Sequence, residues 1–199
     1  MAAMSCDMDK EPYGVLSDET AIQSVADCKS YRTGLYVAMR YITTGSILYY
    51  PDMQTDLYHG VASNGNPYGN NIYTGSLLAS QEEFETIWGT YFGIIGSTNF
   101  IIGKTRLLLD SDEFTEDEKT EMRRYMGEAL CMRALCYFSL SDRFCAPYSR
   151  ENAGITASGL PLVTDYDPTS DNSQYPGRST LAETYTRITD DLENAYTYI

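Results

Sequence analysis

Hydrophobic residues recur at helical spacing in four stretches of the chain. The first stretch runs from about residue 18 to residue 43, the second from 80 to 109, the third from 115 to 144, and the fourth from 180 to 199. In each of them apolar side chains return every three, four or seven residues, which places them on one side of a helix. The pattern therefore predicts four amphipathic helices.

Three of these predicted helices begin at a capping-box pattern, in which Ser or Thr precedes Glu by three residues. The pairs are Ser80 with Glu83, Thr115 with Glu118, and Thr180 with Glu183. Each partner of such a pair satisfies a backbone N–H of the first helical turn. The first helix is expected to begin after Asp18. Because no convincing pair of strands interrupts the pattern, we predict an all-α fold.

Long irregular segments separate the predicted helices, at residues 56–76 and 146–178. Antiparallel helix pairs with apolar faces are typical of stacked, TPR-like architectures. We divide the chain into an N-terminal tether, residues 1–17, and a helical domain, residues 18–199. The last apolar stripe reaches Ile199 without a Gly or Pro stop signal, so we expect this domain to be truncated at its C-terminus.

Composition narrows the classes of partner and chemistry. The net charge of -14 repels phosphate backbones, so we expect no nucleic-acid partner. The lone histidine, His59, makes His-based metal sites and Ser-His or Cys-His catalysis poor hypotheses. We expect no catalytic residue, no metal site and no cofactor. The segment 165–172 has oxygen ligands that resemble a loose calcium loop, but it lacks the Gly and the final Glu of an EF-hand.

The segment "GEALCMRALCYFSL", residues 127–140, is apolar almost all round a helix and yet contains Arg133. A buried guanidinium is costly unless it is paired, and the nearest acidic candidates lie on the last helix. We predict a structural ion pair between Arg133 and Asp191, with Asp190 as the alternative partner. Trp88 lies among apolar residues of the second helix, where we expect core packing. Gly89, Gly93 and Gly96 suggest that a neighbouring helix approaches closely there.

The cysteines do not show metal-ligand spacing. Cys131 and Cys136 lie five residues apart on one predicted helix, about 140° apart around its axis, and a rise of roughly 7.5 Å is too long for a disulfide. A disulfide from Cys28 to Cys131, Cys136 or Cys145 remains open. Near the N-terminus, "SCD" resembles the trimmed end of a lipoprotein signal, with Cys6 as the acylated residue.

The segment 56–76 carries the candidate ligand-binding residues. Aromatic rings and amide side chains are interleaved there, namely Tyr58, Tyr68, Asn70, Asn71 and Tyr73. Flat rings beside amide donors and acceptors suit a polyhydroxylated ligand. The alternative interpretation is a loop that packs its own aromatic side chains.

Several segments, in order along the chain, resemble the SusD/RagB family of outer-membrane nutrient-binding lipoproteins. They are "SCDMDKEP", "GLYVAMR", the set Trp88, Phe92, Ile95 and Asn99, then "GEALCMRALCYFSL", "GLPLVTD" and "GRSTLAETYTRITDDLENA". Together they cover most of residues 6–199. Family members are much longer, so the chain resembles their N-terminal part.

The resemblance implies a fold, a location and partners. It implies a helical, TPR-like fold and a lipid at Cys6 that anchors the protein, exposed, on the bacterial outer membrane. It also implies non-catalytic binding of oligosaccharides or other nutrients, which are delivered to a SusC-like TonB-dependent transporter. Two alternatives stay open from the residues alone: a helical-repeat adaptor that binds another protein, and an acidic glycosidase that uses two carboxylates.

Overall fold

The computed structural model describes residues 18, 20–55, 71 and 76–199 of the chain. Within these ranges the helices are α1 (Val25–Ile42), α2 (Ser46–Met53), α4 (Glu82–Leu109), α5 (Glu116–Phe144) and α6 (Leu181–Tyr198), with a short 3-10 turn η1 (Asn172–Gln174). Among the described residues, strand-like pairing is limited to one isolated bridge between Pro161 and Arg178. The predicted all-α fold is confirmed.

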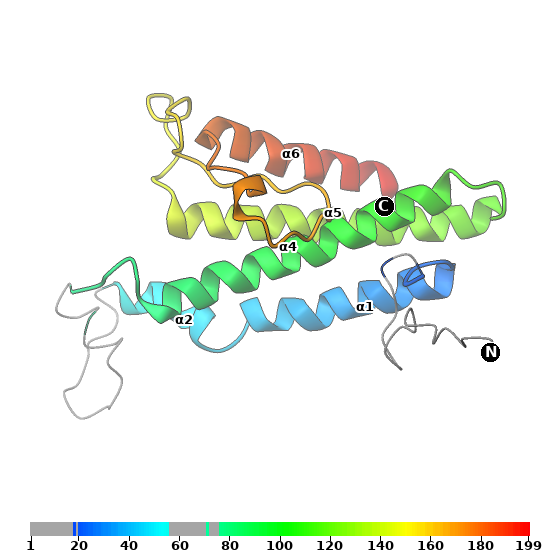
Figure 1. Ribbon diagram of the computed structural model, residues 1–199, viewed down its shortest axis with the longest axis horizontal. Coiled ribbons are helices and arrows are strands. Elements are labelled where there is room, and N and C mark those ends of the chain that lie inside the picture. The colour runs from blue at the N-terminus through cyan, green and yellow to red at the C-terminus, as the bar shows by residue number, and fades with distance from the viewer. Residues whose placement is uncertain (1–17, 19, 56–70, 72–75) are drawn as a thin grey trace, which may run out of the picture.

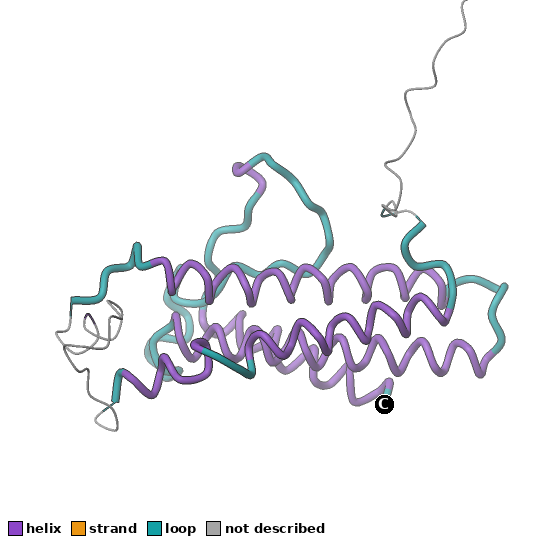
Figure 2. Tube along the Cα trace, turned by 90° about the horizontal axis from the view of Figure 1, so that it is seen from below, coloured by secondary structure: helices purple, strands orange, loops and turns teal. Residues whose placement is uncertain are grey.

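The four long helices lie side by side, and each runs antiparallel to the long helix before it (Figure 1). Helix α5 is central, because it packs against α1, α4 and α6. The connection between α5 and α6 leaves the bundle and returns to it. Figure 2 shows part of this connection as an arch that stands away from the helices and carries η1 near its top.

The core consists of two clusters of buried side chains along α5. One cluster lies between α1, α4 and the first half of α5, and includes Leu35, Ile101 and Tyr125. The other contains Tyr137 and Leu140 from the second half of α5, together with residues of α4 and α6 and Leu160 of the connection. The connection is therefore part of the core at its start.

Two of the three predicted capping boxes are present. Thr115 Oγ1 accepts from Glu118 N at 3.3 Å, and Glu118 Oε2 accepts from Thr115 N at 2.9 Å. Thr180 and Glu183 form the same reciprocal pair at the start of α6. The hydrogen bonds that the Glu118 carboxyl accepts from Thr115 hold its pKa below its ordinary value.

The predicted starts of the other two long helices are wrong. Ser80 lies in a turn, and α4 is capped at Gln81 without a side-chain hydrogen bond to the helix backbone. Helix α1 starts at Val25, because Ser24 Oγ accepts from Asp27 N at 3.2 Å and so caps the helix six residues after Asp18. Helix α2 was not predicted, since it is only 8 residues long and contains a proline.

The glycines of α4 do not mark a close helix contact. A Cβ atom added at Gly89, Gly93 or Gly96 would meet no described atom of a neighbouring segment within 4 Å. Gly159 is the opposite case, because a Cβ there would come within 2.2 Å of the Thr180 carbonyl oxygen. The close approach predicted for the α4 glycines is therefore wrong, and a close approach that was not predicted occurs where the connection meets the start of α6.

This difference in free space predicts that a glycine-to-alanine substitution has opposite effects on stability at Gly93 and at Gly159. Gly93→Ala should raise the free energy of unfolding by about 0.5–1 kcal/mol, because alanine loses less backbone entropy in a helix. Gly159→Ala should lower it by about 1–3 kcal/mol, because the methyl group is forced against backbone. Urea unfolding followed by circular dichroism measures both, and a loss of stability in Gly93→Ala would contradict the open space at that position.

Candidate functional site

A buried arginine joins three helices and the connection. The Arg133 side chain is 4% exposed and Asp191 is fully buried. Arg133 Nε and Nη2 each donate to one oxygen of Asp191, both at 2.7 Å. Arg133 Nη1 donates to Asn99 Oδ1 at 2.7 Å and to the Thr164 carbonyl oxygen at 3.1 Å. The structure thus brings together the two residues that the sequence pairs, and adds two neutral acceptors.

The same polar cluster fixes the middle of residues 161–168, a segment here called the strip, at the backbone of residues 163–165. Asn99 Nδ2 donates to the carbonyl oxygens of Val163 at 2.9 Å and Asp165 at 3.3 Å. The Tyr137 hydroxyl donates to the Val163 carbonyl oxygen at 3.0 Å and accepts from Val163 N at 2.8 Å. Burial raises the pKa of Tyr137 to about 12, so the hydroxyl keeps the proton that it donates. Side chains of α4 and α5 therefore hold a segment that has no regular secondary structure.

A cleft of about 750 Å³ opens between α4 and residues 161–176. We call it the tryptophan cleft. Its walls are the rings of Trp88, Phe92 and Tyr175 with Leu162 and prolines, and its polar lining comes from Thr164, Asp165, Asp167, Thr169 and Gln174. The indole packs against two other rings, since its ring centre lies 4.8 Å from that of Phe92 and 5.1 Å from that of Phe144.

Arg178 lies beside the indole and links the end of the connection to Gly159 and to the end of α5. Its Nε donates to the Gly159 carbonyl oxygen at 2.7 Å and its Nη2 to the Phe144 carbonyl oxygen at 2.8 Å. The guanidinium carbon lies 5.9 Å from the centre of the Trp88 ring, within cation–π range.

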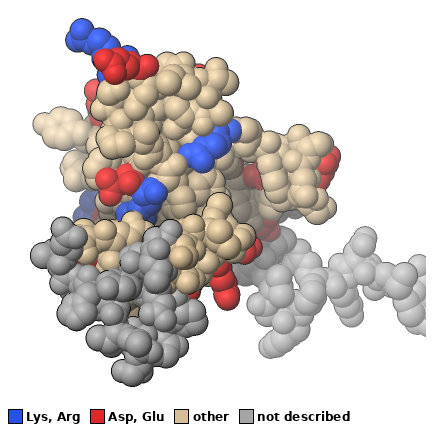
Figure 3. Space-filling view, turned by 90° about the vertical axis from the view of Figure 1, so that its left-hand side faces the viewer, with Lys and Arg blue, Asp and Glu red and all other residues tan. Residues whose placement is uncertain are grey.

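Figure 3 shows the end of the bundle where α4 begins, and most of the described surface there is neither acidic nor basic. The negative charge of the chain is therefore not concentrated on this end.

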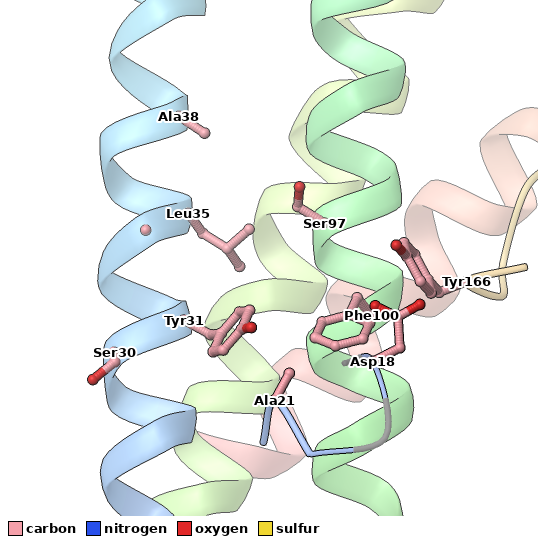
Figure 4. Close-up of a pocket in the computed structure, with 10 residues that line it drawn as sticks. Asp18, Ala21, Ser30, Tyr31, Leu35, Ala38, Ser97, Phe100 and Tyr166 are labelled. Atoms are coloured by element: carbon pink, nitrogen blue, oxygen red, sulfur yellow. The ribbon is translucent and has the colours of Figure 1, made fainter. Parts of the chain in front are cut away.

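A second hollow, of about 570 Å³, lies between α1, α4 and the strip (Figure 4). We call it the tyrosine groove. Its aromatic residues form a series, with ring centres 5.5 Å apart between Tyr31 and Phe100 and 4.8 Å apart between Phe100 and Tyr166. Asp18, Ser30 and Ser97 add polar groups to its lining.

Most of the predicted ligand-binding residues, and the predicted lipidation site, lie outside the described residues. This holds for Tyr58, Tyr68, Asn70, Tyr73 and Cys6. Asn71 is described: it is half-buried, and its carbonyl oxygen accepts from Ser76 N at 2.8 Å. Ligand binding by this segment therefore stays a prediction.

The described part of the chain also bears on metals, thiols and membrane spans. It contains no group of three or more His, Cys, Asp or Glu side chains placed to hold a metal ion. In the segment compared with a calcium loop, Asp171 caps η1 by accepting from Ser173 N at 3.0 Å. Cys28 is a free thiol, with its sulfur 3.6 Å from Thr105 Oγ1, so it forms no disulfide with the other three described cysteines. None of the described helices is long and apolar enough to cross a membrane.

Comparison with known families agrees with this helical arrangement. The SusD-like family model, described as "Starch-binding associating with outer membrane", matches residues 8–199. The chain belongs to the SusD-like family. No match was found among curated proteins.

Solved structures share the SusD-like fold. A protein described as sugar-binding from Bacteroides vulgatus is 26% identical, with a TM-score of 0.73 over 90% of this chain. A SusD superfamily protein from Bacteroides thetaiotaomicron is also 26% identical, with a TM-score of 0.65 over 89%. A second Bacteroides vulgatus member, at 23% identity and a TM-score of 0.63, supports the fold alone. The chain spans 38% of the length of each of these proteins, and the predicted TPR-like fold is confirmed.

Both hollows were missed by sequence reasoning about this SusD-like chain. Trp88 does pack on core residues, as its helical spacing predicts, but it is only half-buried and also lines a cleft. The opposite wall comes from residues 161–176, whose sequence has no periodicity to reveal what they face. The signal that was available is the motif "GLPLVTD", which overlaps the strip.

Removing the charge of Asp191 tests whether the polar cluster holds the site together. Asp191→Asn leaves Arg133 buried without its counter-charge, so we expect a loss of about 3–5 kcal/mol in the free energy of unfolding. The double variant Arg133→Met with Asp191→Leu removes both charges and should recover much of that loss. Urea unfolding of the two variants makes the comparison, and equal stability of Asp191→Asn and the wild type would show that the pair is not a structural constraint.

Thiol labelling tests the packing of α5. Burial raises the pKa of the Cys136 thiol to about 12, and its side chain is 0% exposed, so it should resist iodoacetamide in the folded protein at about pH 8. Cys131 and Cys145 are half-buried and should react first. Peptide mass spectrometry before and after denaturation in urea identifies the labelled residues. Labelling of Cys136 as fast as Cys145 in the folded state would contradict this packing.

Proposed function

We propose that this chain binds saccharides without catalysis at the bacterial outer membrane and belongs to a protein that delivers them to a SusC-like TonB-dependent transporter. Two comparisons support the proposal: the family description names starch binding and the outer membrane, and one similar structure is described as sugar-binding. We further propose anchoring through a lipid on Cys6, with residues 1–17 as the tether of a helical domain that starts at residue 18. Because the relatives are longer, we also propose that the domain continues beyond residue 199.

The observation that carries the proposal is the tryptophan cleft. A sugar ring presents an apolar C–H face and a rim of hydroxyl groups, so it fits beside a flat aromatic ring that is flanked by hydrogen-bonding groups. The cleft offers that combination, with Trp88 and Tyr175 as rings and carboxylate, hydroxyl and amide groups around them. Its volume of about 750 Å³ falls within the usual range for ligand pockets, roughly 300–1,000 Å³. We propose that Tyr58, Tyr68, Asn70, Asn71 and Tyr73 contribute further contacts.

Protein binding is a second candidate function, favoured by exposed apolar side chains on the last two helices. Leu135 and Phe138 of α5 are 43% and 49% exposed, and Leu192 and Tyr196 of α6 are 47% and 87% exposed. Side chains of this kind are enriched at protein interfaces. This surface is separate from the tryptophan cleft, so the two functions are compatible.

Substitutions in the tryptophan cleft test saccharide binding. Trp88→Ala and Tyr175→Ala should each weaken binding of maltoheptaose by about 2- to 10-fold, which is the energy of one aromatic contact expressed as an affinity ratio. Tyr175 is 57% exposed, so its removal should leave the fold intact even if Trp88→Ala destabilises it. Isothermal titration calorimetry gives the affinities.

The matched control is Tyr196→Ala, which removes an exposed tyrosine of α6 that lines neither hollow and should leave affinity unchanged. Chromatography of the sugar after long incubation should recover it intact, as expected for a binding protein. Unchanged affinity in both cleft variants would contradict this site, and hydrolysis of the sugar would favour the glycosidase alternative.

A further inference from the structure

The tryptophan cleft and the tyrosine groove lie along one ridge of α4. Phe92 lines the cleft, Phe100 lines the groove, and Gly96 lies between them, four residues from each. Residues four apart are neighbours on the same side of a helix, so the three positions follow one another along its surface. The two rings are separated by eight residues, or about 12 Å along the helix axis. That distance exceeds the length of one sugar ring.

The surface between the two hollows is not occupied by side chains of α4. Gly96 and Gly93 carry none, and a Cβ atom built at either position would find no described atom of another segment within 4 Å. Ser97, the next residue along, already lines the tyrosine groove. A chain of sugar rings that leaves the cleft over this surface therefore reaches the groove without displacing a side chain of the helix.

The tyrosine groove offers the same kind of contacts as the cleft. Phe100 is only 8% exposed and supports Tyr166, which is 43% exposed and meets it edge-to-face with the ring centres 4.8 Å apart. Tyr31 completes the aromatic series on the side of α1. Hydroxyl groups of Ser30 and Ser97 and the carboxylate of Asp18 also line the groove (Figure 4). Rings beside hydroxyl and carboxylate groups again suit a polyhydroxylated ligand.

The strip fixes the relative position of the two hollows. Thr164 and Asp165 line the tryptophan cleft, and the next residue, Tyr166, lines the tyrosine groove. The backbone at 163–165 is held by the buried side chains of Asn99, Arg133 and Tyr137. Because both sites are built on one rigid segment, little ordering is needed to bring them into register, which favours simultaneous occupation by one ligand.

We propose that the tyrosine groove is a second subsite for the saccharide bound at the tryptophan cleft, so that the ligand is an extended oligosaccharide. The inference rests on the proposed function and adds a size class to it. The oligosaccharide crosses the surface at Gly96 and places further rings against Tyr166 and Tyr31, which Phe100 supports from the core. A single terminal sugar occupies one hollow only.

Chain length is the direct test. Maltose and maltoheptaose are titrated into the protein by calorimetry, and maltoheptaose should bind about tenfold more tightly, as one added aromatic subsite predicts. Tyr166→Ala should reduce the affinity for maltoheptaose and leave that for maltose unchanged. Because Tyr166 is 43% exposed and lies outside the buried core, its removal should not prevent folding, and circular dichroism verifies this.

Blocking the surface between the hollows is an independent test. Gly96→Leu places a side chain on the ridge between Phe92 and Phe100, and should bring the affinity for maltoheptaose down to that for maltose. The matched control is Gly154→Leu, the same change at an equally open glycine of the connection that lines neither hollow. The control should bind maltoheptaose as the wild type does.

The outcomes separate this inference from the proposed function. If the wild type binds neither sugar, the proposed function is contradicted, and the second subsite with it. If it binds both with equal affinity, or if Tyr166→Ala and Gly96→Leu leave the preference for maltoheptaose intact, saccharide binding stands and the second subsite is rejected. A preference that both variants abolish and Gly154→Leu retains supports the second subsite.

Discussion

The burial of one positive charge determines much of this structure. The guanidinium of Arg133 is stable in the interior only when its donors are satisfied, because an unpaired charge there costs several kcal/mol. No single neighbouring element satisfies it: α6 supplies Asp191, α4 supplies Asn99, and the strip supplies the Thr164 carbonyl oxygen. The charge is therefore compensated only when all three are in place around α5, and the packing of the helices is coupled to the path of an irregular segment.

That coupling links the interior of the bundle to its surface. Residues 163–165 form no strand or helix, yet five hydrogen bonds with the side chains of Asn99, Arg133 and Tyr137 fix them. The strip is thus held above α4, and the hollows on its two sides are formed by the fold and do not need a ligand to appear. Rings that line a fixed hollow lose little conformational entropy on binding, which is the physical basis of preorganisation. The formal charge of -14 matters less here, because a neutral ligand is neither attracted nor repelled.

Sequence patterns between residues a few positions apart predicted part of this structure correctly. They failed where contacts with a segment distant in the sequence determine the structure. The boxes at Thr115 and Thr180 depend on residues three apart, so their sequence suffices. Arg133 could be paired with Asp191 because both positions follow from helical spacing and from the cost of an unpaired charge. Ser80 has the same pattern as the two true boxes, but a turn that ends one residue later takes it out of the helix. The tryptophan cleft could not be found, because most of its lining comes from a segment without periodicity. The tyrosine groove could not be found because it lies mostly between α1 and α4, whose relative placement helical spacing does not give.

The open glycines of α4 show how the hollows and the stability of the bundle are connected. Glycine inside a helix costs about 0.5–1 kcal/mol relative to alanine, a cost that close packing against a neighbour normally explains. No such contact exists among the described residues at Gly89, Gly93 and Gly96, so packing does not account for them. The proposed second subsite accounts for Gly93 and Gly96, since any side chain there would narrow the passage between the two aromatic sites. On that proposal, α4 keeps this face bare for binding at a cost in stability, which is a common relation between stability and function.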